Sequence, residues 1–439
     1  MKLQLNHLYL LALLFAFTSC DEDDLPERNF DPVLMSIEPV RGMAKEVVTI
    51  YGRNFSSVKD KNEVNFAGKS ATVIEASPTR MQVVAPAGNG ETQVEVSVNG
   101  TTAGGQTALF TYLEPQKFYK VSTLAGNSDY GLIDGKGIDA YFRNPEGVAM
   151  DPDGNLIVVD RTNNSIRKVS QEGEVITLTG NGTKGFVNGT LDQARFNYPW
   201  KPAVDQEGNI FVADRDNHVI RKISKDGTVS TYAGNGSSGY KDGSASGAQF
   251  YQPIDVAVDQ HGVVYVADNI NHRIRKITPE GVVSTIAGGE AGYKDGEASV
   301  ALLQNPSGIA VDKAGNLYVA DRKNHRIRKI TPEGTVSTVA GNGDQGAEDG
   351  PAAAATFNQP YGLDVSADGG MIIVADLNNH KIRMIFGGNV STVAGSTSGF
   401  LDGVGFTARF TSPTDVAISG DWVYVADLGN HRIRKIELK

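Results

Sequence analysis

Six side chains that could bind a polar ligand interrupt an otherwise regular repeat. They are aromatic, acidic or basic, and each follows a recurring proline by one or two residues: Glu146, Trp200, Lys201, Asp255, Tyr361 and Asp415. Packing alone would require only small residues at such positions. Aromatic faces beside charged groups suit a polar ligand with one apolar face, such as a sugar ring. The alternative is that these side chains plug a central channel through ion pairs such as Lys201 with Asp255.

A sequence repeat that occurs six times in the chain supplies the strands that must position these side chains. One copy, residues 305–343, reads as four runs of Val, Ile, Tyr, Thr and Leu separated by turns at 313–315, 322–324 and 332–334. The aspartate that ends the second run recurs at steps of 54, 54, 53, 55 and 51 residues. This internal repeat predicts a four-stranded antiparallel unit in each copy.

Six such units cannot bury their faces alone, so they are expected to stack radially into a β-propeller. The last copy stops after its third strand at residues 422–438, and the missing fourth strand stands before the first copy at residues 119–126. We therefore predict an all-β chain that ends in a six-bladed propeller, closed by pairing of its first and last segments. Such closure leaves no free sheet edge at the seam.

The repeated pattern P-x-G-x-A-x-D-x-x-G-N-x-Y-V-A-D-x-x-N-x-R-I-R-K-I resembles the NHL repeat family, whose members form six-bladed propellers. The resemblance covers residues 117–439. It is specific for the fold and weak for function, because propellers serve many functions.

Topology indicates which face of the propeller holds the site. The long connections between blades share one face with the turns between second and third strands, and long loops on a rigid scaffold are where function concentrates. The six varying side chains begin the innermost strands and so should surround the channel mouth on this face. An aromatic residue also recurs in the long loops, at Phe186, Tyr240, Tyr293 and Phe400. These aromatics are weaker candidates for sugar stacking, since their recurrence favours packing of the loop onto its blade.

Charged residues that return in every blade are predicted to be architectural. Each aspartate that ends a second strand should accept hydrogen bonds from its own turn and pair with an arginine of the third strand. The aspartates of the long loops, such as Asp295, are interpreted as turn formers. One histidine per blade cannot gather into a metal site, and second strands lie too far from the axis for six carboxylates to share an ion.

The N-terminal residues predict export and anchoring. Residues 1–20 have Lys2, an apolar run at 8–17 and a cysteine at the cleavage point, Cys20, which is the single cysteine of the chain. This resembles a bacterial lipoprotein signal, which implies a lipidated Cys20; an ordinary signal peptide with a chance cysteine is the alternative. Residues 21–32 form an acidic tether that resembles the surface-export signal of Bacteroidetes-type lipoproteins, or else is a merely solvated linker.

Residues 33–113 have a different sequence pattern, with about seven short predicted strands separated by glycine-containing turns. This pattern is typical of an Ig-like β-sandwich. The motifs I-x-P-x-x-G from Ile37, T-I-x-G-x-N-F from Thr49 and F-x-Y from Phe110 resemble the IPT/TIG family, whose members are commonly spacers or interaction modules.

The formal net charge of −10 disfavours nucleic acid as a partner, because phosphate binding needs a basic stripe. No nucleophile elbow, zinc-protease motif or phosphate loop occurs in the sequence. We expect a non-catalytic outer-membrane lipoprotein, exposed on the cell surface, that binds a glycan or glycan fragment without cofactor or metal. The combination of a lipid anchor, an Ig-like domain and a propeller resembles accessory surface lipoproteins of nutrient-uptake systems. That resemblance implies a role in nutrient uptake, with an outer-membrane transporter complex as a partner. The alternatives are a metal-dependent propeller enzyme of lactonase, lyase or hydrolase type that uses axial carboxylates, and a protein interaction or adhesion scaffold.

Overall fold

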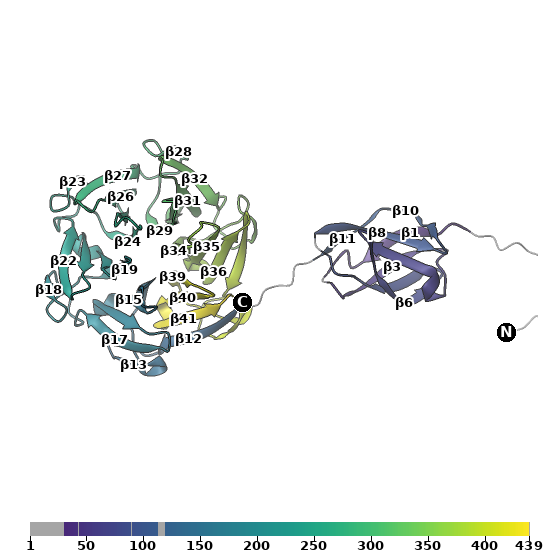
Figure 1. Cartoon of the computed structure of the whole chain (residues 1–439), viewed down its shortest axis with the longest axis horizontal. Coiled ribbons are helices and arrows are strands. Elements are labelled where there is room, and N and C mark those ends of the chain that lie inside the picture. Colours follow the sequence, from purple (N-terminus) through teal and green to yellow (C-terminus); the bar gives the residue numbers. More distant parts are fainter. Residues whose placement is uncertain (1–29, 43, 89, 113–118, 439) are drawn as a thin grey trace, which may run out of the picture. The chain divides into compact units, whose positions relative to one another are not determined.

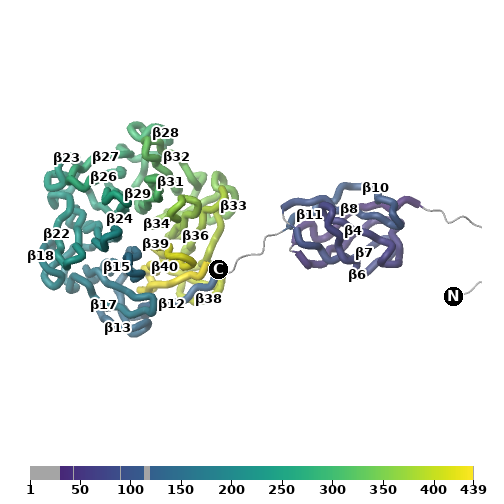
Figure 2. Tube along the Cα trace, in the orientation of Figure 1, coloured from purple at the N-terminus to yellow at the C-terminus, as the bar shows by residue number. Residues whose placement is uncertain are grey.

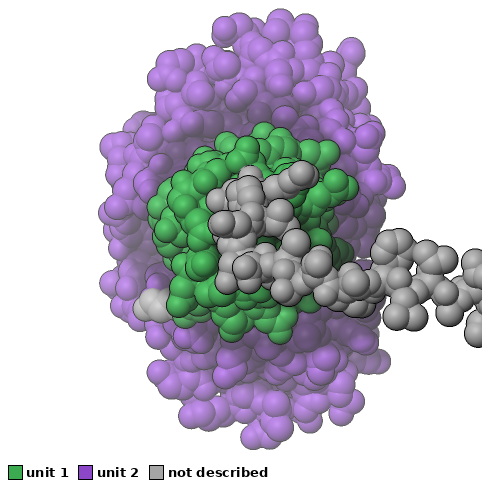
Figure 3. Space-filling view, turned by 90° about the vertical axis from the view of Figure 1, so that its right-hand side faces the viewer, with its two compact units in different colours: residues 1–116 green, residues 117–439 purple. Residues whose placement is uncertain are grey.

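The structure, a computed structural model, describes residues 30–42, 44–88, 90–112 and 119–438. The predicted signal peptide, Cys20 and the acidic tether up to residue 29 lie outside this part of the chain. Contacts divide the chain into two units, residues 1–116 and 117–439, which are coloured separately in Figure 3. Within the described ranges, no helix is long and apolar enough to cross a membrane.

The first unit is a sandwich of two sheets. One sheet has the order β10-β1-β3-β7-β6, and the other has the order β2-β11-β8-β4-β5 with β9 beside β8. The strands are β1 (Val33–Glu38), β2 (Arg41–Gly42), β3 (Val47–Arg53), β4 (Asn62–Phe66), β5 (Lys69–Ser70), β6 (Thr72–Ser77), β7 (Arg80–Val84), β8 (Glu91–Val98), β9 (Thr101–Thr102), β10 (Gly104–Gly105) and β11 (Ala108–Tyr112), and the short 3-10 helix η1 spans Lys59–Lys61.

Alternation of apolar and polar residues produces this sandwich. In β8, every second side chain from Thr92 to Val98 is buried and the others face outward. Phe66 and Phe110 meet edge to face in the core, with ring centroids 5.3 Å apart. The prediction of an Ig-like sandwich is confirmed.

The second unit is a ring of six five-stranded sheets in the described part of the chain (Figure 1). Blade 1 contains β13 (Gly135–Lys136), β14 (Pro145–Met150), β15 (Leu156–Asp160), β16 (Ser165–Val169) and β17 (Glu174–Thr179). Blade 2 contains β18 (Gly189–Thr190), β19 (Pro199–Val204), β20 (Ile210–Asp214), β21 (Val219–Ile223) and β22 (Thr228–Ala233). Blade 3 contains β23 (Gly243–Ser244), β24 (Pro253–Val258), β25 (Val264–Asp268), β26 (Arg273–Ile277) and β27 (Val282–Gly288).

The remaining blades repeat this pattern. Blade 4 contains β28 (Gly296–Glu297), β29 (Pro306–Val311), β30 (Leu317–Asp321), β31 (Arg326–Ile330) and β32 (Thr335–Ala340). Blade 5 contains β33 (Gly350–Pro351), β34 (Pro360–Val365), β35 (Met371–Asp376), β36 (Lys381–Phe386) and β37 (Asn389–Ala394). Blade 6 contains β38 (Gly403–Val404), β39 (Pro413–Ser419), β40 (Trp422–Asp427), β41 (Arg432–Glu437) and β12 (Lys120–Gly126).

Short 3-10 helices complete the loops of the ring. They are η2 (Gly137–Asp139), η3 (Arg161–Asn163), η4 (Arg215–Asn217), η5 (Arg322–Asn324), η6 (Leu377–Asn379), η7 (Gly405–Thr407) and η8 (Leu428–Asn430).

The closure of the ring agrees with the sequence. Strand β12 pairs antiparallel with β41, and Lys120 lies opposite Glu437. The first described residues of the propeller thus supply the fourth strand of blade 6, as the trace in Figure 2 shows.

Each blade has one strand more than the four that were predicted. A two-residue strand from the preceding long loop pairs with the fourth strand, as β13 does with β17. A strand of two residues is too short to show a period-2 pattern, so this element could not be predicted from the sequence.

The innermost strands β14, β19, β24, β29, β34 and β39 surround the axis, and five of them are labelled around the centre of Figure 1. Between the blades, apolar side chains of neighbouring sheets pack together; Phe211 of blade 2 and Phe250 next to blade 3 share one buried cluster. This rigid packing fixes where each inner strand begins.

Candidate functional site

A buried arginine holds each blade together, as blade 4 illustrates. Arg328 is fully buried, and its Nη1 donates to Asp321 Oδ2 at 2.6 Å while its Nη2 donates to Asp295 Oδ1 at 2.5 Å. Asp321 also accepts from Asn324 Nδ2 at 2.8 Å and from the backbone N–H of Gln304 at 2.7 Å. The carboxylate of the second strand thus ties the third strand to the loop that enters the blade.

The other blades repeat this clamp with Arg167, Arg221, Arg275, Arg383 and Arg434 on Asp160, Asp214, Asp268, Asp376 and Asp427. Two interpretations of these residues are corrected. The N–H that each aspartate accepts belongs to the segment before the inner strand, not to its own turn. The loop aspartates are ion-pair partners of the clamp as well as turn residues, because a long loop can return its carboxylate to the third strand.

One side chain per blade ties that blade to the next. The Nδ1 atoms of five histidines each accept the backbone N–H of the residue before the next blade's inner strand, at 3.0–3.3 Å: His218, His272, His325, His380 and His431. In blade 1, Asn164 Oδ1 makes the equivalent bond to the N–H of Tyr198 at 2.9 Å. All six residues have positive φ, between 49° and 57°, a conformation in which Asn and His are enriched.

The rim aromatics lie against arginines of their own blades. Tyr293 has the Arg326 guanidinium carbon 3.8 Å and the Arg328 carbon 4.9 Å from its ring centroid, and Tyr240 and Phe400 are flanked in the same way. Phe186 has Arg221 at 5.3 Å. These contacts hold each ring on its loop, although all four rings remain nearly half exposed.

A buried lysine occupies the channel axis. Lys201 is fully buried, with its Nζ 3.4 Å from Asp255 Oδ2, 3.3 Å from Asp415 Oδ1 and 3.2 Å from the carbonyl oxygen of Ser307. Burial alone would lower the pKa of Lys201, but the two aspartates and Glu146 more than offset it, so this pKa lies above its ordinary value. Burial raises the pKa of Asp255 to about 7 despite the lysine.

The axial carboxylates also link neighbouring inner strands. Asp255 accepts the N–H of Ile309 and Asp415 accepts the N–H of Val148, both at 2.9 Å. The structure therefore brings three of the predicted site residues, Lys201, Asp255 and Asp415, into one ion-pair network below the mouth.

Two aromatic side chains form the floor of the mouth above this network. Trp200 Nε1 donates to the Tyr361 hydroxyl at 2.7 Å, which joins blade 2 to blade 5 across the ring. Tyr361 is buried and its ring centroid lies 5.0 Å from Lys201 Nζ, whereas Trp200 remains partly exposed. Glu146 is buried beside them and accepts from Arg161 Nη1 at 2.8 Å.

Three arginines surround this floor, and the sequence analysis did not single them out. Arg161, Arg215 and Arg322 are the first residues of η3, η4 and η5. The guanidinium carbons of Arg161 and Arg215 lie 4.9 and 4.5 Å from the Trp200 ring, and that of Arg322 lies 5.2 Å from the Tyr361 ring. Alignment of the six copies could have identified these arginines. The residue after the repeated aspartate is arginine in three blades and asparagine or leucine in the other three.

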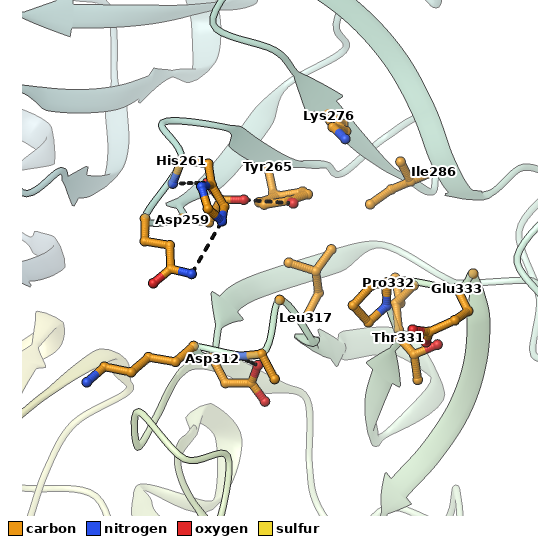
Figure 4. A pocket seen from close by; sticks show the side chains of 16 residues that line it. Asp259, His261, Tyr265, Lys276, Ile286, Asp312, Leu317, Thr331, Pro332 and Glu333 are labelled. Atoms are coloured by element: carbon orange, nitrogen blue, oxygen red, sulfur yellow. Dashed lines mark hydrogen bonds between the residues drawn. The ribbon is translucent and has the colours of Figure 1, made fainter.

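Two cavities lie on the other side of the Lys201 ion-pair network from the mouth, toward the face that carries the tight turns. One cavity of about 240 Å³ is lined by the inner strands, and a second cavity of about 530 Å³ is lined by the turns around the axis. A further pocket of about 400 Å³ lies between the turns of blades 3 and 4, where Tyr265 donates to Asp259 and Thr331, Pro332 and Glu333 form the far wall (Figure 4). Among the described residues, no group of three or more His, Cys, Asp or Glu side chains could hold a metal ion.

Comparisons with known families agree with this architecture. The IPT/TIG domain family matches residues 32–112, and the NHL repeat family matches residues 142–169, 196–223, 250–277, 303–330 and 410–436. The NHL matches correspond to blades 1, 2, 3, 4 and 6. The fold and these matches define a β-propeller protein with an Ig-like domain. The chain thus contains NHL repeats and an IPT/TIG domain.

Among curated relatives, the chain is 32% identical over 282 residues to Protein SUPPRESSOR OF QUENCHING 1, chloroplastic, of Arabidopsis thaliana, covering 60% of this chain and 27% of that protein. It is 29% identical over 299 residues to NHL repeat-containing protein 2 of Homo sapiens, covering 59% of this chain and 41% of that protein. The chain thus spans less than half the length of these relatives.

Two solved structures share the fold over nearly the whole chain. A protein of unknown function from Bacteroides thetaiotaomicron has a TM-score of 0.57 at 22% identity and covers 94% of this chain and 99% of its own. An auxiliary nutrient binding protein from Bacteroides ovatus has a TM-score of 0.56 at 20% identity and covers 93% of this chain and 98% of its own.

Proposed function

We propose that this protein is a non-catalytic lipoprotein of the cell surface, held on the outer membrane through Cys20, that binds a glycan or glycan fragment at the loop-rich mouth of its propeller. It would serve nutrient uptake beside an outer-membrane transporter. The single observation that carries the binding site is Trp200, an indole that is held across the mouth by Tyr361 and remains partly exposed.

The charged layer beneath the aromatics belongs to the proposed site. Lys201, Asp255 and Asp415 hold the inner strands in place, and Glu146 orients Arg161 beside the indole. A site whose polar groups are already paired costs little reorganisation when a ligand arrives. A sugar ring on Trp200 would then be oriented by hydrogen bonds at the edge of the mouth.

The structural neighbour from Bacteroides ovatus supports the nutrient-binding part of the proposal, because its name describes an auxiliary nutrient binding protein and its fold extends over both units. The likeness concerns the fold. The glycan is proposed from the residues of the mouth.

Calorimetry against a panel of neutral and acidic oligosaccharides tests the site. We expect Trp200→Ala to weaken binding by about 1 kcal/mol or more, because the aromatic face is lost. Tyr293→Ala is the matched control, since it removes an aromatic ring from the rim of the same face. Equal affinities of the parent and Trp200→Ala would contradict the site, and cleaved oligosaccharide in the recovered mixture would contradict a purely binding role.

The anchor is tested separately by cell fractionation. Cys20→Ala removes the thiol that would be lipidated, so the variant should leave the membrane fraction while its propeller retains the parent's melting temperature. A Cys20→Ala protein that stays with the outer membrane would contradict the lipoprotein proposal.

A further inference from the structure

The mouth carries three arginines that the clamps of the blades do not require, and two of them form ion pairs, Arg161 with Glu146 and Arg215 with Asp216. The position after each clamp aspartate is Arg161, Arg215 and Arg322 in blades 1, 2 and 4, and it is Asn269, Leu377 and Leu428 in blades 3, 5 and 6. Blades with asparagine or leucine there form the same turn and the same clamp. The turn and the clamp therefore do not require these arginines, although Arg215 and Arg322 also hydrogen-bond the segment before the next blade's inner strand.

The three guanidinium groups converge on the aromatic floor. Two of them lie within 5 Å of the ring of Trp200, and the third lies 5.2 Å from the ring of Tyr361. These two rings are joined by the hydrogen bond from Trp200 to Tyr361. A guanidinium that stacks on an aromatic ring uses its planar face for that contact, so the N–H groups at its edge can still donate hydrogen bonds.

Arg322 at the mouth is hydrogen-bonded to a neutral side chain. Its Nε and Nη2 donate to the neutral Gln359 Oε1 at 3.0 and 2.8 Å, and no carboxylate of the described residues lies within ion-pair distance. Both hydrogen bonds of the Arg322 side chain in the described residues come from Nε and Nη2. The amide positions the guanidinium without neutralising it.

The other two arginines are also incompletely paired. Arg215 donates to Asp216 at 2.8 Å and to the neutral Gln252 at 2.9 Å. Arg161 pairs with the buried Glu146, and its Nε is buried without a hydrogen-bond partner among the described residues. The clamp arginines Arg167 and Arg221 also have a buried Nε without a partner among the described residues, so this feature does not by itself mark a ligand site.

We propose that the ligand of the mouth is an acidic saccharide, whose carboxylate is bound by Arg161, Arg215 and Arg322 while a sugar ring rests on Trp200. This inference rests on the proposed glycan-binding function and specifies the class of glycan. Guanidinium forks match the planar carboxylate and bind it through paired, charge-assisted hydrogen bonds. The chain as a whole is acidic, with a formal net charge of −10, so affinity for an anion must come from this local cluster.

A matched ligand pair tests the proposal on the unaltered protein. We would titrate the protein with oligogalacturonides and with the same oligomers after reduction of their carboxyl groups, and with oligoalginate and its reduced form. The acidic form should bind at least about tenfold more tightly, and raising the salt concentration should reduce that preference.

Variants locate the preference within the chain. Arg322→Gln should reduce affinity for the acidic oligomer about tenfold and leave affinity for the reduced oligomer unchanged. Lys313→Gln is the matched control, because it changes net charge equally, in the same blade, at an exposed position of the opposite face. Melting temperatures of both variants verify that they fold.

The outcomes separate the two proposals. If acidic and reduced oligomers bind equally and both depend on Trp200, the glycan site stands and the acidic ligand is wrong. If no oligomer of either form binds, the proposed function itself is wrong. A preference for carrageenan oligomers, which carry sulfate and no carboxylate, over the carboxylated oligomers would overturn the assignment to a carboxylate.

Discussion

Two arginines of blade 4, six residues apart, show how one side chain serves opposite purposes. Arg328 is fully buried between two carboxylates, and its counterparts return in every blade. Arg322 is partly exposed at the mouth, ends on a neutral amide, and has counterparts in only two other blades. The comparison teaches that repetition marks residues that hold each blade together. Departure from the repeat marks two further kinds of residue: buried ones that link the inner strands, such as Lys201 and Asp255, and partly exposed ones such as Arg322.

The largest effect should follow from breaking a clamp. Arg328→Met would leave Asp321 buried without its cation, so the free energy of unfolding should fall by about 3–5 kcal/mol. Urea denaturation measures this change. The control Arg322→Met should change the free energy of unfolding by less than about 1 kcal/mol, because its guanidinium is partly hydrated. Equal losses in the two variants would erase the distinction between the clamp and the mouth.

The second-largest effect is expected from breaking the axial ion-pair network at Lys201, and the loss of unfolding free energy should depend on pH. Lys201→Met would leave Asp255 and Asp415 facing each other without a cation, so at pH 8 the free energy of unfolding should fall by about 3 kcal/mol. The deficit should shrink as pH falls, since the pKa of Asp255 is raised to about 7 already in the parent and a carboxyl with a raised folded-state pKa stabilises the fold when protonated.

A second variant controls for this network. Lys201→Met combined with Asp255→Asn removes one of the two facing charges, so it should be more stable at pH 8 than Lys201→Met alone. A deficit that is the same at pH 6 and pH 8 in both variants would mean that the axial carboxylates do not titrate as proposed.

The histidines that tie the blades together should make the ring sensitive to mild acid. Burial lowers the pKa of all five histidines, as it does for His325 and His380. The unfolded chain therefore binds protons more readily, so the stability that these residues contribute is present above about pH 6.5 and is lost as pH falls through their folded-state pKa values.

Blade 1 supplies the matched control for that prediction, because Asn164 makes the same inter-blade hydrogen bond without a titratable group. Replacing the five histidines by asparagine should reduce the loss of melting temperature between pH 7 and pH 5 relative to the parent. Asp255 contributes to the pH dependence of stability with the opposite sign, but it is present in both the variant and the parent, so its contribution cancels in the comparison. An unchanged loss would assign acid sensitivity to other groups.

The smallest effect is expected at the rim. Tyr293→Ala removes a ring that lies against Arg326 and Arg328, so the free energy of unfolding should fall by about 0.5–1 kcal/mol. Ligand affinity, measured by calorimetry, should not change. A large loss of affinity would extend the site from the mouth to the rim aromatics.

The sequence predicted what repetition makes visible. The recurring aspartate showed the period, and the displaced strand at residues 119–126 showed how the ring closes. The candidate site could be placed near the axis, since the varying residues all follow the same proline. These inferences needed only comparison of one copy with another.

Contacts across the ring could not be predicted in this way. Trp200 and Tyr361 are 161 residues apart, and nothing in either copy indicates that their side chains meet. The pairing of Arg328 with Asp295 likewise depends on the path of a long loop that has no periodic pattern. Side-chain partners of this kind are set by tertiary geometry and not by local propensity.

The closing strand also has a consequence for the order of synthesis. Strand β12 leaves the ribosome first among the propeller strands, and its partner β41 leaves last, with Lys120 opposite Glu437. Closure must therefore wait for the entire propeller to be made, and pairing between segments so distant in sequence is slow. Until then β12 has an unpaired edge, so a chain truncated before β41 would expose that edge to pairing with other chains.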